Sequence, residues 1–144
     1  MLTNRSAPHA RVVPVLTVAD VRAAVAWYAT VFGFAEHVQI GEGHRAQLGL
    51  PDGGELIVAE VRPGRRLPSE ARSHQIMLKV EDAAAVVARA TEHGATLVNE
   101  LHDWEYGERQ AMIDDAFGHQ WVITQTLVDT APEQWGGKTG TPRS

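Results

Sequence analysis

Two tripeptides, VAD at Val18–Asp20 and VED at Val80–Asp82, decide the fold because each opens a helical stretch at the same place in two similar halves of the chain. The first stretch ends at Gly33 and the second at Gly94. The second aspartate follows the first by 62 residues, and the second glycine follows the first by 61. Aspartate accepts hydrogen bonds from the first helical turn, and glycine ends helices readily. The chain is therefore predicted to contain one unit twice.

Short runs rich in β-branched and apolar residues surround both helical stretches, and a glycine turn separates the last two runs of each half. The runs cover residues 12–18, 34–40, 46–50 and 56–61 in the first half and 75–80, 95–99, 110–113 and 120–126 in the second. The predicted fold class is α+β, with tandem βαβββ modules that form one curled, mainly antiparallel sheet with helices on its outer face. Residues 1–10 are expected to form a flexible arm, 11–126 a single domain of two modules (about 11–61 and 74–126), and 127–144 a tail.

Composition excludes several classes of protein. The 144 residues carry a net charge of -5 and contain no cysteine, so neither a nucleic-acid partner nor disulfide or thiolate chemistry is expected. No apolar stretch approaches the roughly 18 residues of a membrane span. The N-terminus lacks the apolar core of a signal peptide, which predicts a cytoplasmic protein without a membrane partner.

Five short segments of the chain are distinctive: Val18–Asp20, Trp27-Tyr28, Phe32–Phe34, Tyr106–Arg109 and Asp115–Trp121. These motifs resemble those of the vicinal oxygen chelate superfamily, which includes glyoxalase I, extradiol dioxygenases, and fosfomycin- and bleomycin-resistance proteins. The resemblance covers about residues 12–126. It implies the paired βαβββ fold and a homodimer, but it specifies activity weakly because one fold serves many functions.

The resemblance also implies a metal ion held by up to four side chains, one from the first and one from the last strand of each copy. These positions map here onto Val13, Val58, Gln75 and Val122. Three isopropyl groups have no lone pair for a cation, so neither a metal nor another cofactor is expected. His74 is one residue away from such a position, and alternation along a strand predicts that its side chain points to the other face, unless a bulge intervenes.

Alternation also divides the strand residues between the concave face and the helix-facing core. The concave set is predicted to be Val13, Val15, Leu56, Val58, Gln75, Met77, Gln120, Val122 and Thr124. The helix-facing set is predicted to be Ile57, Ile76, Leu78, Val80, Trp121 and Ile123. The concave set, apolar with two amides and a hydroxyl, suits a flat organic ligand held by packing and a few hydrogen bonds.

The predicted binding site combines strand residues with a polar loop near the cavity mouth. Trp104 and Tyr106 lie in that loop, where contact with a ligand and contact with a second subunit are both open. Arg109 either faces the cavity or pairs with a carboxylate such as Glu108 or Asp114. The predicted ligand-binding residues are Gln75, Met77, Trp104, Tyr106, Arg109, Gln120 and Val122; no catalytic or metal-binding residue is assigned.

Other conspicuous residues have simpler interpretations. Trp121 is expected in the core, Trp27 and Tyr28 in the core or a dimer contact, and Asp114 and Asp115 at a turn. The seven histidines show neither HxH nor HExxH spacing.

Three functions therefore compete. The favoured hypothesis is a metal-free protein that binds a small organic molecule, such as a drug- or antibiotic-binding protein of the resistance type. The alternative is a metal-dependent lyase, isomerase or dioxygenase that uses displaced ligands such as His74, Glu60 or His119. A third is a metal-free enzyme that uses Arg109, His74 or Glu60 as acid or base.

Overall fold

The helices and strands follow one order twice in the computed structural model, which describes residues 1–143. The first copy comprises β1 (Val15–Thr17), α1 (Val21–Phe32), β2 (Ala35–Ile40), β3 (Arg45–Gly49) and β4 (Glu55–Ala59). The second comprises β5 (Ile76–Lys79), α2 (Ala83–Glu92), β6 (Thr96–Asp103), β7 (Glu108–Asp114) and β8 (Gln120–Thr126), and a short 3-10 helix, Pro132–Gln134, follows. The duplicated βαβββ order and the α+β class are confirmed.

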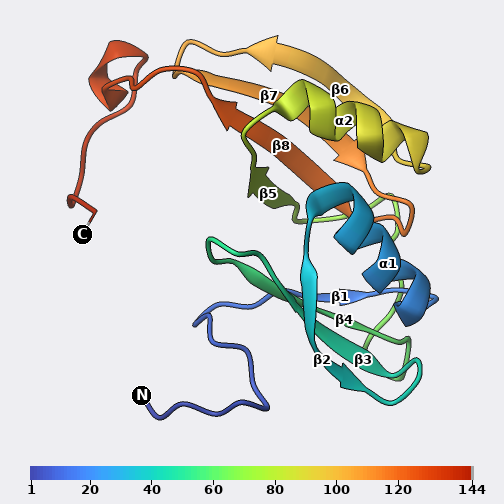
Figure 1. Cartoon of the computed structure of the whole chain (residues 1–144). Coiled ribbons are helices and arrows are strands. Elements are labelled where there is room, and N and C mark those ends of the chain that lie inside the picture. The colour runs from blue at the N-terminus through green and yellow to red at the C-terminus, as the bar shows by residue number, and fades with distance from the viewer. Residues whose placement is uncertain (144) are drawn as a thin grey trace. The chain divides into compact units, whose positions relative to one another are not determined.

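Both helices begin and end as the repeat predicts. Asp20 accepts a hydrogen bond from the Ala23 N–H of α1, and Asp82 accepts one from the Ala85 N–H of α2, each at 3.0 Å. Gly33 follows α1 with φ 82°, a conformation that costs glycine little because it has no Cβ. The equivalent cap fixes the start of each helix on its own sheet, and Figure 1 shows α1 and α2 each lying along one face of the strands of its own copy.

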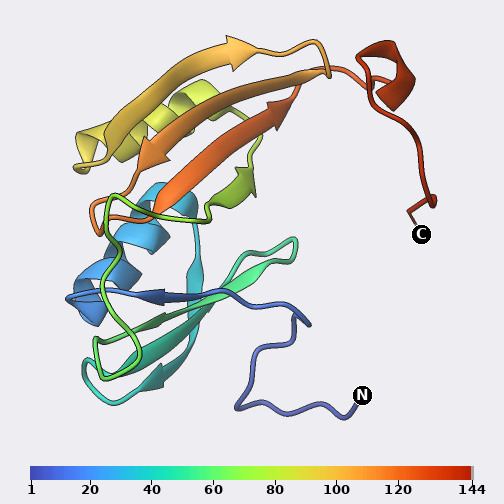
Figure 2. The same ribbon diagram turned by 180° about the vertical axis from the view of Figure 1, so that it is seen from behind.

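The strands form two four-stranded sheets rather than one continuous sheet. Their orders are β1-β4-β3-β2 and β5-β8-β7-β6. In each sheet the first strand pairs in parallel with the last strand of its copy, and the other pairings are antiparallel. Figure 2 shows the strands of each sheet from behind. The mainly antiparallel character is confirmed, and the two copies share the same strand order.

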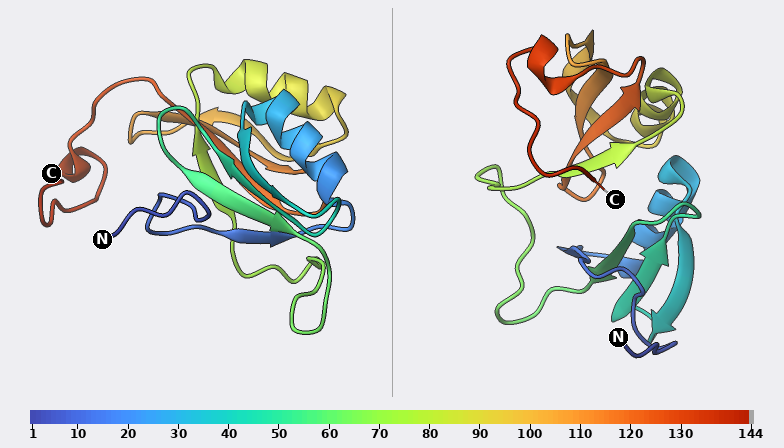
Figure 3. Two further views of the ribbon diagram at one scale, coloured as in Figure 1. Left: turned by 60° about the horizontal axis from the view of Figure 1, so that its bottom comes forward. Right: turned by 90° about the vertical axis from the view of Figure 1, so that its left-hand side faces the viewer.

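The chain divides into two compact units, but the division does not follow the repeat completely. The first unit holds residues 1–73 together with Phe117–His119, the turn between β7 and β8, and the second holds the remainder. The Phe117 ring lies 6.1 Å from Trp27, and the His119 Nε2–H donates to the Thr17 carbonyl over 2.8 Å. The views in Figure 3 show the long connection between β4 and β5 as an extended loop. Neither α-helix in the described chain is long and apolar enough to cross a membrane.

The helix-facing side of the second sheet agrees with prediction. Trp121 and Ile123 of β8 are 0% exposed, and Leu78 of β5 pairs with Ile123. Gln125, on the same face, accepts a hydrogen bond from the Ala83 N–H at the start of α2 over 2.9 Å. This core face is apolar because it excludes water beneath the helix.

In the first sheet the predicted faces are wrong for β4. Val15 pairs with Ile57, and Leu16 pairs with Val58, so Val58 shares a face with Leu16. The buried face under α1 consists of Leu16, Ala46, Leu48, Leu56 and Val58. The error arises because the spacing between equivalent residues of the two copies is not constant. It is 62 residues for the first strands, from Leu16 to Leu78, but 65 residues for the last strands, from Val58 to Ile123. The count from the glycine turn used a spacing that was one residue too short for the last strands.

A second difference concerns the segment predicted as a loop from Glu100 to Glu108. Strand β6 continues through Asp103, and β7 begins at Glu108, so the loop contains only residues 104–107. Its two aromatic side chains, Trp104 and Tyr106, therefore lie at the tip of a β-hairpin, next to the end of β8.

Candidate functional site

The four positions that the family would use for metal ligands do not fit a metal ion. The corrected register replaces Val58 by Ile57, because Ile57 pairs with Val15 in the same way that Val122 pairs with Met77. The four side chains are then those of Val13, Ile57, Gln75 and Val122. Three have no donor atom, and the amide nitrogen of Gln75 is 3.1 Å from the Gln120 Oε1 to which it donates.

Two of the three substitute ligands named for a metal have other partners. Glu60 lies 2.9 Å from His44 Nδ1, and His119 is buried and bonded to a backbone carbonyl. His74 is an exposed residue just before β5. Across residues 1–143, no three histidine, aspartate or glutamate side chains gather in a group that would hold a metal ion.

The open face of the β5–β8 sheet, which is the side away from α2, carries most of the predicted ligand-binding residues. Met77 is 63% exposed, and it pairs across the strands with Val122, which is buried. On one side Gln75 donates to Gln120, and Gln120 donates to Asp114 Oδ1, each over 3.1 Å. Met77 and Val122 thus form an apolar strip, and the hydrogen bonds hold the side-chain amides beside it in fixed orientations.

A second polar row crosses the same face. The Gln110 Nε2 donates to Thr124 Oγ1 over 3.1 Å, and the Thr124 hydroxyl donates to Glu108 Oε1 over 2.8 Å. Thr124 is buried, so both of its bonds are sheltered from competing water. The two rows hold their side chains in place, and such fixed donors and acceptors can orient a ligand at small entropic cost.

An aromatic cluster stands at the end of this face. The rings of Trp104 and Tyr106 are parallel within 5°, with centroids 5.8 Å apart, and the Trp135 ring of the tail lies 5.1 Å from Tyr106. Trp104 is 45% exposed and Trp135 is 38% exposed. The His102 ring packs edgewise on Trp104, with ring centroids 4.4 Å apart. The rings of the cluster therefore pack against one another and still expose aromatic surface to solvent.

The Tyr106 hydroxyl links the aromatic cluster to the polar rows. It donates to Gln110 Oε1 over 3.0 Å. Burial raises the pKa of the Tyr106 hydroxyl, and the negative charge of Glu108 raises it further. The group thus remains a protonated donor at neutral pH. Gly107, with φ 86°, lets the tail lie directly on the loop, because the Leu127 N–H donates to the Gly107 carbonyl over 2.8 Å.

Arg109 does not join this face. It precedes Gln110 on β7 and pairs with Gln125, so alternation places its side chain on the side of α2. Its guanidinium forms two hydrogen bonds with Asp103, of 2.7 and 3.0 Å, rather than with Glu108 or Asp114. The bonds with Asp103 raise the pKa of Arg109 and lower that of Asp103.

The simpler interpretations of the remaining residues agree with the structure. Trp121 donates through Nε1 to the buried Asp115 over 2.8 Å, whereas Asp114 binds Gln120, so the two carboxylates have separate structural partners. Trp27 and Tyr28 are buried side chains of α1.

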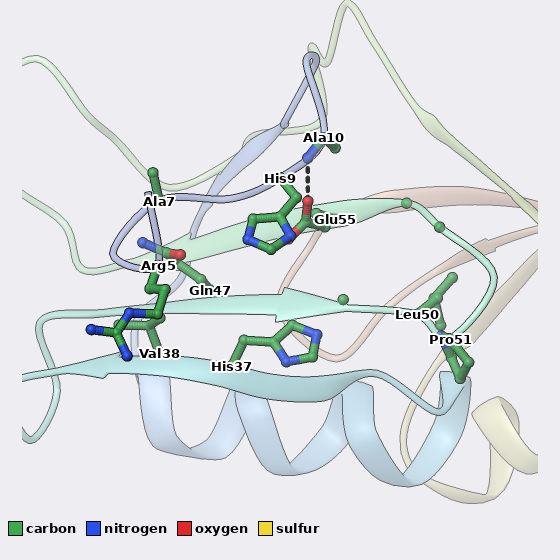
Figure 4. A pocket seen from close by; sticks show the side chains of 13 residues that line it. Arg5, Ala7, His9, Ala10, His37, Val38, Gln47, Leu50, Pro51 and Glu55 are labelled. Carbon is green, nitrogen blue, oxygen red and sulfur yellow. Dashed lines mark hydrogen bonds between the residues drawn. The ribbon is translucent and has the colours of Figure 1, made fainter. Parts of the chain in front are cut away.

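Sequence reasoning missed a cavity of about 560 Å³ in the first unit. It lies on the side of the first sheet away from α1, under the N-terminal arm, as Figure 4 shows. Its polar lining includes Arg5, His9, His37, Gln47 and Glu55. The arm residues precede every predicted element, and a bulge in β2 alters the alternation at His37, so no periodicity pointed to this group.

Comparison with known proteins places the chain in a large group. Residues 8–123 match the family model described as Glyoxalase/Bleomycin resistance protein/Dioxygenase superfamily. Among solved structures, TioX from Micromonospora sp. ML1 is 30% identical; the match covers 85% of this chain and 100% of TioX, with a TM-score of 0.63.

More distant structures share the fold alone. A glyoxalase-related enzyme from Fulvimarina pelagi is 18% identical over 93% of this chain and 100% of its own, with a TM-score of 0.68. A glyoxalase/bleomycin resistance protein/dioxygenase family enzyme from Burkholderia phytofirmans PsJN is 19% identical over 80% of this chain and 97% of its own, with a TM-score of 0.67.

A shorter match in sequence joins the chain to a mycobacterial protein. The uncharacterized protein Rv0887c of Mycobacterium tuberculosis is 42% identical over 52 residues, 36% of this chain and 31% of that protein. The match thus spans about a third of the length of this mycobacterial relative.

Proposed function

This chain belongs to the glyoxalase/bleomycin resistance protein/dioxygenase superfamily, and we propose that it binds a flat, largely apolar organic molecule without a metal ion. The ligand lies on the open face of the β5–β8 sheet. The observation that carries the proposal is that the exposed Met77 and its neighbour Val122 lie between rows of hydrogen-bonded amides on that face. Such a protein sequesters its ligand unchanged, as a drug- or antibiotic-binding protein would. A homodimer remains a prediction.

The chemistry of the family's ligand positions supports binding without a metal. Ile57 and Val122 offer only hydrocarbon, and Gln75 already bonds to Gln120. A divalent ion needs several nitrogen or oxygen donors, which these positions lack. Of these side chains, Val122 lies on the open face of the β5–β8 sheet and suits contact with an apolar ligand.

The open face of the second sheet supplies the contacts that a flat ligand needs. Met77 projects an adaptable thioether into solvent, and sulfur contacts with aromatic rings are favourable. Gln75, Gln120 and Gln110 border the strip and present amide groups in fixed orientations. These amides would orient the polar edge of a ligand whose faces rest on the apolar strip.

The magnitudes are sufficient for binding without a metal. Covering apolar surface contributes about 25 cal/mol per Å². Stacking on Trp104 or Tyr106 adds roughly 0.5–1.5 kcal/mol. An amide left without a partner costs about 1–3 kcal/mol, so a ligand that ignores the glutamine rows binds poorly. Aromatic molecules with a polar edge are therefore the favoured class.

A fluorescence and thermal-shift screen of aromatic natural products and drugs tests the proposal. For any hit, Met77→Ala and Trp104→Ala should each weaken binding by about 5- to 30-fold, since truncation of a central contact costs roughly 1–2 kcal/mol. Leu67→Ala, an exposed apolar side chain of the loop between β4 and β5, is the matched control and should leave affinity unchanged.

Two results would contradict the proposal. Hits that bind all three variants as tightly as the unmodified chain would place the site elsewhere. Near-stoichiometric Zn, Ni, Fe or Mn in freshly purified protein, together with chemical conversion of the bound molecule, would indicate the metal-dependent enzyme instead. Recovery of the ligand intact by mass spectrometry is the expected result.

A further inference from the structure

The N-terminal arm closes a cavity over the open face of the first sheet. The Gln47 Nε2 donates to the Ser6 carbonyl over 3.0 Å, and the Ala10 N–H donates to Glu55. Gln47 and Glu55 point from β3 and β4 toward the arm (Figure 4). Both ends of the arm segment that lines the cavity are therefore bonded to the sheet, and the partly open space of about 560 Å³ falls in the range of small-molecule sites.

A β-bulge directs one imidazole into this cavity. Glu36 pairs with Leu48 and Val38 pairs with Gln47, so His37 between them has no partner on β3. The bulge lets His37 and Val38, although consecutive, both line the cavity. Bulges often re-aim side chains beside functional sites.

The neighbouring strand leaves room for this imidazole. A Cβ at Gly49 would lie 2.7 Å from His37 Nε2 and 2.9 Å from Cδ2, so the ring rests on the backbone where a larger residue has no space. The bulge and Gly49 are independent features, and together they fix the position of His37 inside the cavity.

The ionisable side chains of the lining are mostly groups that can donate hydrogen bonds to an anion. They are one arginine and two histidines, against a single carboxylate. That carboxylate, Glu55, already accepts the Ala10 N–H. Arg5, His9 and His37 have no hydrogen-bond or ion-pair partner among residues 1–143.

We propose that this cavity binds a small organic anion, with a carboxylate or phosphate group held by Arg5, His9 and His37. Guanidinium groups bind both oxyanions through two parallel hydrogen bonds, and imidazole N–H groups add further donors. Val38, Leu50 and Pro51 line the remaining wall and would contact the apolar body of the ligand. This site differs from the one under Proposed function in its unit, its residues and its ligand chemistry.

Calorimetric titration of the full chain with benzoate, phenyl phosphate and neutral benzamide, at constant ionic strength, tests the proposal. At least one of the two anions should bind, and benzamide should bind about tenfold more weakly or not at all, because it lacks the charge that Arg5 requires. Comparison of benzoate with phenyl phosphate distinguishes a carboxylate site from a phosphate site. Equal binding of benzamide and both anions, or no binding of either anion at millimolar concentration, would overturn the proposal.

Matched variants locate the site. Arg5→Gln should weaken anion binding about tenfold, while Arg11→Gln, an exposed arginine of the same segment outside the lining, should not. Gly49→Ala should displace the His37 ring and weaken binding, while Gly43→Ala, with no atom within 4 Å of the added Cβ, should not. If Gly49→Ala fails to fold, His37→Asn replaces it. Equal affinity for Arg5→Gln and Arg11→Gln would contradict the assignment, whatever the effect of Trp104→Ala on aromatic ligands.

Discussion

The open faces of the two sheets differ far more than the faces beneath their helices. Under α1 and α2 both sheets present buried apolar side chains, such as Val58 in one and Ile123 in the other. On the open side the first sheet is covered by the arm and borders a cavity lined by an arginine and two histidines, whereas the second exposes Met77 between glutamine rows. The helix side must exclude water for either unit to fold, so its chemistry is constrained. The open side is not constrained in this way, and there the two copies carry different side chains.

The largest loss of stability is expected from a substitution on the helix side of the second sheet, compared with one on its open side. Trp121→Ala removes a fully buried ring and leaves Asp115 without its donor, so it should reduce the free energy of unfolding by about 3–5 kcal/mol. Met77→Ala, on the adjoining strand but on the open side, should change it by less than about 0.5 kcal/mol. Chemical denaturation measures both changes. Comparable losses in the free energy of unfolding would show that the open side also contributes to the stability of the fold.

A smaller effect should separate the aromatic cluster from the rest of the open face. An alanine Cβ at Gly107 would overlap the Val128 carbonyl oxygen and lie 2.7 Å from Thr130 Oγ1, in addition to the cost of φ 86°. Gly53→Ala, at φ 103° with no atom within 4 Å, carries the backbone cost alone.

Gly107→Ala should therefore destabilise the chain by about 1–3 kcal/mol more than Gly53→Ala. It should also change tryptophan fluorescence, because the tail that carries Trp135 rests on this loop. Unchanged fluorescence in a destabilised Gly107→Ala would show that the tail does not complete the cluster.

The smallest effect concerns the pair of Arg109 and Asp103 on the helix side. The bond with Arg109 lowers the pKa of Asp103, so the pair stabilises the fold above the ordinary pKa of an aspartate, and this contribution disappears as pH falls through the lowered value. Both groups are well exposed, and solvent screening keeps the contribution small.

Asp103→Asn should accordingly lower the free energy of unfolding slightly at pH 7 and leave it unchanged at strongly acidic pH. Denaturation at several pH values, with Arg109→Gln as the matched variant, measures the difference. A gap between the unmodified chain and Asp103→Asn that widens toward acid would mean that the pair is not the cause.

Part of the candidate site was predictable from local pattern. Gln75, Met77, Gln120 and Val122 were assigned to the open face of the second sheet by alternation, and the structure places them there. For Arg109 the sequence left open whether it faces the cavity or pairs with a carboxylate, and the structure pairs it with Asp103. Val58 was assigned to the wrong face because the last strands of the two halves are further apart in sequence than the glycine turns indicate.

By itself, the sequence determined the repeated βαβββ order, the caps at Asp20 and Asp82, and the absence of metal-binding side chains at the family's positions, because these depend on residue type and short-range spacing. Tertiary structure alone decided the rest. The bulge at His37 breaks the regular alternation. The hydrogen bonds of the arm to Gln47 and Glu55, and the contact of the Trp135 ring with Tyr106, join segments distant in the chain. Such contacts depend on the register and packing of whole strands, and a register shift of one residue moves every side chain of a strand to its other face.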